Sequence, residues 1–487
     1  MPLLGPMNSF APNNNIMNIR KVYLPLLMVL CMLSCHAKTE PKIYVSSSEG
    51  NDRNDGKSPA SPMRSLDAAI KKGKDIYLKS GDIFYGNIEL REKHLHSYGP
   101  GARPVICGYK RIINPKWKKA GKNVWKINLK ENNFTGVDTR GSSVLNNVGC
   151  IHEYDLDLIH GRKVEHKKDL RRDWDMWQVS EFSNDKVKPQ QFDELFLYLK
   201  KNPNKLKLEF STGVNGVYLK NSSMEGIEVR GFGRHGIAAY TNTTIRNCRI
   251  DAIGGMMQIG VRNFVCLGNG IEFWINLEPV EDCLVEGCYI SRCYDCGMTI
   301  QGSENSKYTP RNILAQNNFI TECCQAWEDF LNNGRQYDNC RFKGNTVANC
   351  GNTSGFGYPD NRFIFCNVLG HNHRVRNGMI IEGNTFIGGN YYSASPSVPE
   401  YKSNIWRNNT FITSRGHWIL GYYTGTKDVI YLPKDRGRYR TLDEATNAAI
   451  RQYREKTGDQ TTTFTIKSEE EVEALIRQYK QRYSGNK

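Results

Sequence analysis

The sequence Ile-Arg-Asn-Cys-Arg-Ile at residues 245–250 returns five more times, with the same order of apolar and polar positions, in the second half of the chain. The copies begin at Val285, Ala315, Phe342, Ile381 and Trp406. Measured from Cys248, the equivalent positions advance by 40, 30, 27, 39 and 25 residues. Self-similarity at a period of about 20–50 residues is typical of folds that stack one structural unit on the next.

Each copy alternates apolar and polar residues with a period of two, which is the pattern of a half-buried β-strand. The Asn or Gly residues at its centre mark a turn. Because no amphipathic helix separates the copies, the units can bury their apolar faces only by stacking as coils of a solenoid. We therefore predict an all-β fold in which residues 216–425 form a parallel β-helix.

Two residue types inside the repeat have structural explanations. Asparagines at one turn position predict a hydrogen-bonded ladder, because side-chain amides pair in this way between stacked parallel strands. Most of the 15 cysteines fall within the repeat, and cysteine behaves as a small buried hydrophobe, so we expect packed thiols and not a disulfide framework. Cys293 and Cys296 together with Cys323 and Cys324 leave a zinc site or a redox pair open as the alternative.

The segments outside the repeat predict further parts of the same domain. Residues 36–104 are expected to form an N-terminal cap and the first coils. Residues 105–215 predict a β-rich insertion or heavily decorated coils. The tail, residues 426–487, has apolar residues at helical spacing over 469–483, which predicts a C-terminal capping helix, because the open ends of a solenoid must be covered.

The N-terminus has the pattern of a signal peptide. Basic residues at 18–21 precede an apolar run over 22–33, which is too short to cross a membrane. The run ends at Cys35 in a sequence that resembles a lipobox, so residues 1–35 predict a lipoprotein signal; cleavage after Ala37 by an ordinary signal peptidase is the alternative. We expect an exported protein in the periplasm or at the outer membrane of a Gram-negative bacterium, attached to the membrane only through its lipid.

The formal net charge of +16 favours an anionic partner such as a polyuronate, a nucleic acid or a membrane surface. Export argues against nucleic acid. Lysines crowd residues 110–130, 161–172 and 186–207, outside the repeat, where a solvated surface explains them equally well. The prediction that remains is a monomer that binds a polysaccharide.

Outward side chains of a parallel β-helix form columns, with successive coils about 4.8 Å apart. Alignment of the coils by their repeats places Glu272, Thr299 and Asp329 in one outward column. Asp295 precedes the middle strand of this set, and Glu328 adjoins Asp329. The sequence therefore predicts a group of carboxylates on one face of the solenoid.

Paired carboxyl groups are the usual catalytic groups of glycoside hydrolases, one protonating the leaving oxygen and the other attacking the sugar or activating water. Two rungs between Glu272 and Asp329 give about 9–10 Å, near the upper limit of the roughly 6.5–9.5 Å typical of inversion, whereas about 5–5.5 Å indicates retention. We predict a catalytic pair among Glu272, Asp295, Asp329 and Glu328, with no metal or cofactor. A solvated acidic face is the alternative for any one residue.

Polar and aromatic residues near these carboxylates are candidates for holding a sugar chain. They are Arg262, Asn269, Trp274, Gln301, Trp327 and His235. Aromatic rings can stack on sugar faces, amides can bond hydroxyl groups, and arginine pairs with a uronate carboxylate through two parallel hydrogen bonds. Burial in the core or in turns is the alternative explanation.

Several of these residues also carry a resemblance to a known family. They are Gly50, Asn51, Asp52, Gly56, Pro62, Ser65, Leu66 and Ala68, and the segments 269–274, 285–288 and 294–302. They are similar to pectate-lyase-like, right-handed parallel β-helix proteins of Bacteroidetes that act on carbohydrates, over residues 42–425. The resemblance implies a right-handed, single-stranded coil, a polysaccharide-degrading role and acidic residues in a groove. Residues 105–215 depart from the short-loop members, which leaves the substrate class open.

Two other functions fit the same sequence. A polysaccharide lyase would abstract a proton beside a uronate carboxylate with a basic residue, with Ca²⁺ or arginine neutralising the carboxylate. Its candidates are Arg262, Arg292, Lys307, His235 and His373, although no Asp-rich calcium cluster like that of pectate lyases is present. A non-catalytic lipoprotein that binds glycans on the solenoid face is the third interpretation.

Overall fold

The structure is a computed structural model of the full chain, and its most regular part is a set of stacked parallel strands. The residues that it describes are 42–132, 134, 147–164, 166–178, 193–257, 267–303, 305–331, 335–351, 366–371, 378–389, 392–395, 404–414, 418–420 and 441–484. The predicted signal peptide, the lipidation site Cys35 and the candidates Arg262 and His373 lie outside these residues.

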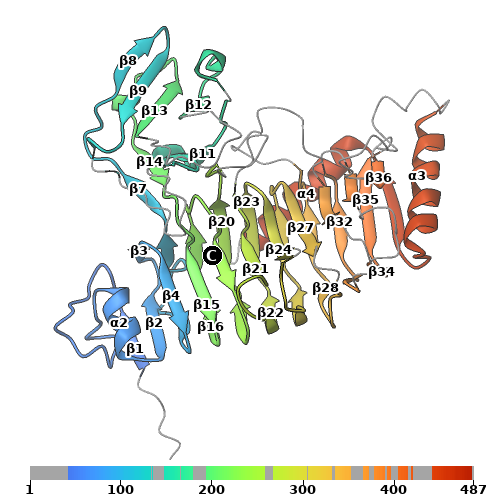
Figure 1. Ribbon diagram of the computed structural model, residues 1–487, viewed down its shortest axis with the longest axis horizontal. Coiled ribbons are helices and arrows are strands. Elements are labelled where there is room, and N and C mark those ends of the chain that lie inside the picture. Colours follow the sequence, from blue (N-terminus) through green and yellow to red (C-terminus); the bar gives the residue numbers. More distant parts are fainter. Residues whose placement is uncertain are drawn as a thin grey trace, which may run out of the picture. The chain divides into compact units, whose positions relative to one another are not determined.

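Three long sheets, called A, B and C, carry the fold (Figure 1), and all strand pairs within them are parallel. Sheet A contains β1 (Lys42–Val45), β2 (Asp75–Lys79), β5 (His94–Tyr98), β16 (Ser222–Glu225), β19 (Thr243–Arg246), β22 (Glu281–Glu286), β25 (Arg311–Gln316), β28 (Arg341–Lys343), β31 (Ile380–Glu382) and β34 (Ile405–Arg407). Sheet B contains β3 (Ile83–Tyr85), β6 (Val105–Cys107), β17 (Glu228–Arg230), β20 (Arg249–Ile253), β23 (Tyr289–Cys293), β26 (Phe319–Thr321), β29 (Thr346–Ala348), β32 (Thr385–Ile387), β35 (Thr410–Ser414) and β37 (Thr463–Lys467). Sheet C contains β4 (Ile88–Arg91), β15 (Val217–Lys220), β18 (Ile237–Ala239), β21 (Ile271–Trp274), β24 (Cys296–Gly302), β27 (Gln325–Leu331), β30 (Cys366–His371), β33 (Tyr392–Ser395) and β36 (Trp418–Leu420).

From β15 to β36 the chain visits sheets C, A and B in rotation, so that three consecutive strands make one coil. Each strand pairs with its counterpart three strands further on, as β21 does with β24 and β24 with β27. This arrangement of strands makes an all-β parallel solenoid, as the repeats predict. The apolar positions of the repeats point inward and form one continuous core, in which Ile245, Val285 and Ala315 are fully buried.

The central residues of the repeat form the predicted asparagine ladder. Asn318, Asn345, Asn384 and Asn409 are buried, and each of the first three donates from Nδ2 to Oδ1 of the next at 2.9–3.1 Å. The same Oδ1 atoms accept backbone N–H groups, for example that of Asn318 at Asn345. The ladder begins where Cys288 donates its backbone N–H to Asn318, since cysteine holds this position in the two earlier copies.

The residue before each ladder position turns the chain with a positive φ. Asn247, Asn317 and Asn408 have φ of 50–55°, and Gly287, Gly344 and Gly383 have φ of 62–64°. Asparagine and glycine are the residues that adopt this left-handed conformation at low cost. The Asn or Gly pattern of the sequence is therefore a backbone requirement of the corner between sheets A and B.

The cysteines are packed thiols, as predicted. All those whose side chains the structure describes are buried and unpaired by disulfides, including Cys248, Cys283, Cys288 and Cys293. The Sγ atoms of Cys248, Cys283 and Cys288 contact backbone carbonyls of the same or the preceding coil, as Cys283 does with Tyr240 at 3.0 Å. The thiols therefore fill the interior of the solenoid where a small apolar side chain fits.

Helices lie at the N-terminal and C-terminal segments of the solenoid. Helix α2 (Leu66–Lys72) buries Leu66 and Ala69 against the first coil. Helix α3 (Leu442–Thr457), which the sequence analysis did not predict, buries Tyr453 against Trp406 and Phe411 of the last repeat. It therefore covers the apolar interior at that end.

The helix that the sequence did predict, α4 (Glu469–Ser484), has a different role. Its residue Val472 joins a cluster with Phe319, Ala348 and Ile387 on the outer face of sheet B, and Tyr483 stacks on Phe319 with ring centres 4.6 Å apart. The apolar spacing of α4 therefore serves packing along the side of the solenoid. In the described part of the chain no helix is long and apolar enough to cross a membrane.

Residues between Tyr109 and Ser211 form two antiparallel sheets. One contains β7 (Tyr109–Arg111), β10 (Ile151–Glu153), β11 (Leu158–His160) and β14 (Leu208–Ser211), and the other β8 (Lys118–Gly121), β9 (Val124–Asn128), β12 (Met176–Trp177) and β13 (Glu194–Tyr198). The 3-10 turns η2 (Tyr154–Leu156), η3 (Lys167–Asp169) and η4 (Pro203–Lys205) connect strands here. A separate core that includes Trp125, Leu197 and Phe210 holds this segment together.

We predict that Asn345→Ala lowers the free energy of unfolding by about 2–4 kcal/mol, because it leaves buried ladder groups of Asn318, Ala315 and Asn384 unpaired. Chemical denaturation monitored by circular dichroism measures the loss. Lys343→Ala on the same coil, where the side chain is exposed, is the control and should change stability little. Equal stability of both variants would contradict a stabilising role for the ladder.

Candidate functional site

Carboxylates of two coils lie in one column on sheet C. Parallel pairing aligns Ala238 with Glu272, Glu272 with Thr299, and Thr299 with Glu328. We call this row the acid column. Glu272 and Glu328 are each 6% exposed, and Thr299 between them is fully buried, so the two carboxylates stand two rungs apart with little access to water.

A second row, the polar column, lies at the start of the strands of sheet C, two residues before the aligned inward residues, and consists of Asn215, His235, Asn269, Cys296 and Gln325. Each of the first three side chains accepts the backbone N–H of the next residue in the row. The distances are 3.3 Å at Asn215 Oδ1, 3.2 Å at His235 Nδ1 and 3.3 Å at Asn269 Oδ1. The polar column therefore ties four successive coils together along the acid column.

Gly270 allows a residue of the polar column, Asn269, to lie close to a residue of the acid column, Glu272. Gly270 separates Asn269 from the strand that carries Glu272, and a Cβ atom there would lie 2.5 Å from the carbonyl oxygen of Gly297 and 2.9 Å from Cys293 Sγ. Only glycine fits such a close approach. As a result Asn269 Nδ2 reaches Glu272 Oε1 at 3.3 Å.

The tautomer of His235 follows from its partners. Its Nδ1 atom accepts the backbone N–H of Asn269, which can only donate, so the ring proton is on Nε2. Nε2 faces Glu272 Oε1 at 3.5 Å. Glu272 therefore meets two donor groups, one from His235 and one from Asn269.

Glu328 is surrounded by donors as well. Its Oε2 atom accepts from Cys296 Sγ at 3.1 Å, from Thr299 Oγ1 at 3.3 Å and from Gln301 Nε2. Burial and the neighbouring carboxylates Asp295 and Glu328 raise the pKa of the Cys296 thiol well above its usual range, so the thiol keeps its proton, which can point to Gln325 Oε1 at 2.8 Å or to Glu328 Oε2 at 3.1 Å. Donors that converge on one oxygen stabilise the negative charge of a carboxylate.

Asp295 has the opposite environment. It lies between β23 and β24, where its backbone bonds Gly268 of one coil and Gln325 of the next. Burial raises the pKa of Asp295 well above its usual range, and the charges of Glu328 and, more weakly, Glu272 add to the effect. Asp295 therefore retains its proton to a higher pH than an exposed aspartate does.

Asp295 and Glu328 approach each other closely. One carboxylate oxygen of each and the Sγ atom of Cys296 all lie within 4.8 Å of one another. Carboxyl groups with oxygens this close are compatible with the roughly 5–5.5 Å spacing of retaining glycoside hydrolases and closer than the roughly 6.5–9.5 Å typical of inversion. The same three atoms could also hold a metal ion, with the thiol losing its proton on binding.

The expected position of Asp329 is wrong by one residue. Glu328 pairs with Thr299, whereas Asp329 pairs with inward-facing Ile300 and is fully buried, with Oδ2 accepting from Asn404 Nδ2 at 2.9 Å. The reason is Trp327, which fills the coil interior beside Met298 and packs on Phe342 with ring centres 5.0 Å apart. The sequence suggested that Trp327 contacts a sugar, but its side chain is fully buried in the coil interior. Asp329 also lies inside the coil.

Of the other residues that the sequence predicted, two lie at the site and two lie away from it. Trp274 and Gln301 pair with each other at the partly exposed end of the same strands. Arg292 lies on sheet B, where its guanidinium binds the buried Asp251, and it is therefore not part of the cluster. Lys307 is exposed in the loop after β24.

Sequence reasoning missed Gln325 and considered Cys296 only with the other cysteines, whereas the two side chains are in contact at 2.8 Å within the cluster. A signal for them was present. Asn269, Cys296 and Gln325 all stand immediately before the small residue at the start of a strand, Gly270, Gly297 or Ala326. Alignment on this small residue, and not on the aromatic residues that follow, would have given the register of the structure.

No protein-family model matches this chain, and no curated protein matches its sequence. Similar solved structures include one titled glycoside hydrolase, with a TM-score of 0.41, 11% identity and coverage of 90% of this chain and 98% of that one. Another is the complex of XylC with xylose, with a TM-score of 0.40, 10% identity and coverage of 87% and 82%. A GH136 lacto-N-biosidase from Eubacterium ramulus has a TM-score of 0.35 and 12% identity, with coverage of 88% of this chain and 68% of that one. A rhamnogalacturonan lyase has a TM-score of 0.29 and 9% identity, with coverage of 76% of this chain and 74% of that one.

We predict that Asp295→Asn makes the protein more stable than the wild type at about pH 8, and that this advantage shrinks toward about pH 4. The raised pKa of Asp295 means that the folded state favours the protonated carboxyl, so stability is lost as the pH rises through that pKa. An amide carries no charge at either pH. Melting temperatures across this range measure the difference, with Asp282→Asn, an exposed carboxylate, as the control. A constant difference would contradict the proposed protonation.

Proposed function

We propose that the protein is a glycoside hydrolase that cleaves a polysaccharide with retention, using Asp295 as acid and base and Glu328 as nucleophile. The observation that carries the proposal is that an oxygen of each carboxyl group lies within 4.8 Å of the other, with the pKa of Asp295 raised and Glu328 accepting hydrogen bonds from Thr299 and Gln301. Two neighbouring carboxyl groups with separated roles are the usual arrangement for this chemistry.

In the first step, an oxygen of Glu328 attacks the anomeric carbon and forms a carbon–oxygen bond. The glycosidic bond breaks, its electron pair stays on the departing oxygen, and that oxygen takes the proton of Asp295. In the second step, a water molecule gives a proton to Asp295 and attacks the anomeric carbon, which releases Glu328 as a carboxylate. Protons and charge return to their starting positions.

The surrounding residues have supporting roles in this proposal. Thr299 and Gln301 orient Glu328 through hydrogen bonds to Oε2. Glu272, held by His235 and Asn269, keeps a negative charge near Asp295 and so favours the protonated acid. Trp274, partly exposed at the end of β21, would contact the sugar chain.

The location and fine architecture belong to the same proposal. The chain passes through the three sheets in turn, which favours a right-handed, single-stranded β-helix, because connections between parallel strands are almost always right-handed. The N-terminal sequence pattern supports export and acylation at Cys35. A polysaccharide outside the cytoplasm is the substrate that suits such a protein.

Amide substitutions test the assignment. We expect Asp295→Asn and Glu328→Gln each to lower kcat at least ~100-fold, since acid–base catalysis alone contributes about 10²–10⁴. Glu272→Gln should lower kcat less, because Glu272 affects only the pKa of Asp295 through its charge. The assay is release of reducing sugars from a panel of plant and host polysaccharides.

Asp329→Asn is the matched control, because it changes the adjacent carboxyl group, which is buried inside the coil against Asn404. It should keep its activity per folded molecule. Full activity of Asp295→Asn or Glu328→Gln, or loss with Asp329→Asn alone, would overturn the assignment. Unsaturated products that absorb ultraviolet light would indicate a lyase, and binding without release of sugars a non-catalytic glycan-binding protein.

A further inference from the structure

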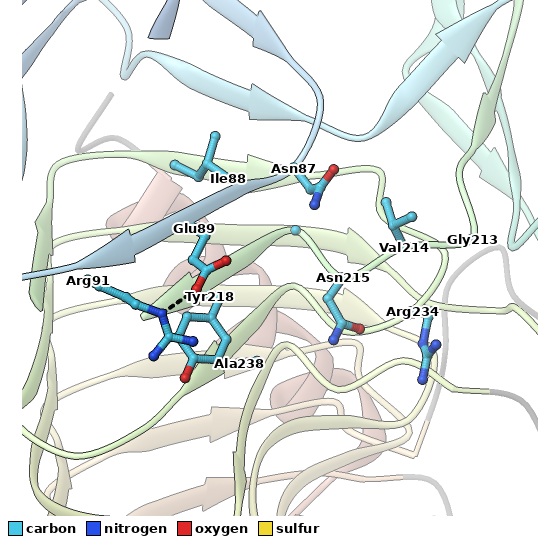
Figure 2. Close-up of a pocket in the computed structure, with 11 residues that line it drawn as sticks. Asn87, Ile88, Glu89, Arg91, Gly213, Val214, Asn215, Tyr218, Arg234 and Ala238 are labelled. Carbon is cyan, nitrogen blue, oxygen red and sulfur yellow. Dashed lines mark hydrogen bonds and ion pairs between the residues drawn. The ribbon is translucent and has the colours of Figure 1, made fainter. Parts of the chain in front are cut away.

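A pocket of about 270 Å³ opens on the early coils of sheet C (Figure 2). Its polar lining consists of Asn87, Glu89, Arg91, Asn215, Tyr218 and Arg234. None of these residues takes part in the proposed reaction. The pocket nevertheless belongs to the same face of the solenoid as the carboxylate pair.

The strand register connects the pocket to the acid column. Glu89 pairs with Tyr218, Tyr218 with Ala238, and Ala238 with Glu272. Ala238 also lines the pocket, three rungs before Glu328. At about 4.8 Å per rung, the near edge of the pocket is about 14 Å from Glu328, so the pocket would hold a sugar other than those at the cleaved bond.

The polar column makes a second connection. Asn215 lines the pocket and accepts the backbone N–H of His235, whose ring faces Glu272. Arg234, the residue before His235, also lines the pocket. One short segment of chain therefore presents Arg234 to the pocket and His235 to the carboxylates.

The side chains favour charge and hydrogen bonding over ring stacking. The Arg91 guanidinium lies over the Tyr218 ring at 4.4 Å and contacts Glu89, and the Tyr218 hydroxyl donates to Glu278 at 2.6 Å. The ring is thus covered by a cation. Arg234 approaches from the other side with Asn215, so guanidinium and amide groups line the space from both sides (Figure 2).

We propose that this pocket binds the carboxylate of an acidic sugar unit in the glycan that the carboxylate pair cleaves. The inference rests on the proposed function for the identity of the ligand as a sugar. Arginine binds a carboxylate through two parallel hydrogen bonds, and amides suit the hydroxyl groups beside it. Glu272 and Glu328, the two carboxylates further along the acid column, repel such a group, so the charge gradient sets the direction in which the chain lies.

Binding of free monosaccharides to the wild-type protein tests this without hydrolysis. The probes are galacturonic, glucuronic and N-acetylneuraminic acids, with galactose and glucose as neutral counterparts, followed by saturation-transfer NMR and calorimetry. We expect at least one acidic sugar to bind and the neutral ones to bind at least about tenfold more weakly, because the charge-assisted bonds are lost. The acid that binds best distinguishes a uronate from a sialylated glycan.

Arg234→Gln and Arg91→Gln should each weaken acid binding about tenfold or more. The control is Arg246→Gln, since Arg246 is an exposed arginine paired with Glu286 on sheet A, as Arg91 is paired with Glu89. Arg91 is about half exposed, so its variant tests the pocket even if Arg234→Gln folds poorly. The inference would be overturned if acidic and neutral sugars bound equally or if none bound. It would also be overturned if neither arginine variant weakened the binding of the acidic sugar. Acid binding by a protein that hydrolyses nothing would reject the proposed reaction and leave the pocket standing.

Discussion

The parallel backbone pairing of each coil with the next is the interaction on which the rest of this structure depends. It fixes the register of sheet C, and the register decides that Glu272, Thr299 and Glu328 share a column. It also stacks the ladder asparagines, whose amides add buried hydrogen bonds along the sheet A to sheet B corner. A single-residue slip would turn Glu328 inward and Asp329 outward, so the chemistry of the face and the stability of the core have the same origin.

The carboxylate cluster costs stability that the coils must supply. Burial opposes ionisation of Asp295, and the nearby charges of Glu328 and Glu272 add to this effect. The protein offsets this with donors from neighbouring coils, which include Thr299, Gln301 and the protonated Cys296. Sites with such unfavourable contacts are expected where function requires them, because stability and activity make different demands on the same residues.

The sequence was sufficient for much of the fold but for only part of the site. The period-two repeats with Asn or Gly at the turn predicted the parallel solenoid, since few other arrangements can bury such short apolar faces. Glu272, His235 and Asn269 were recognised and lie together. The register at β27 was not predictable from the aromatic pattern, because Trp327 and Phe330 both fit an inward position and only packing against Phe342 decides between them. Helix α3 was missed because its apolar face is narrow, with Tyr453 as the buried residue that contacts the last repeat.

The stereochemistry of the first product is the most direct test of the central claim, that Asp295 and Glu328 act as a close pair. Proton NMR recorded during the first turnovers, with a polysaccharide identified by screening, reports the anomeric configuration before the product equilibrates. A separation near 5 Å leaves no room for a water molecule between carboxylate and sugar, so the account predicts that the configuration is retained. Initial formation of the inverted anomer would contradict it and would point to a more widely spaced pair, such as Glu272 with Glu328.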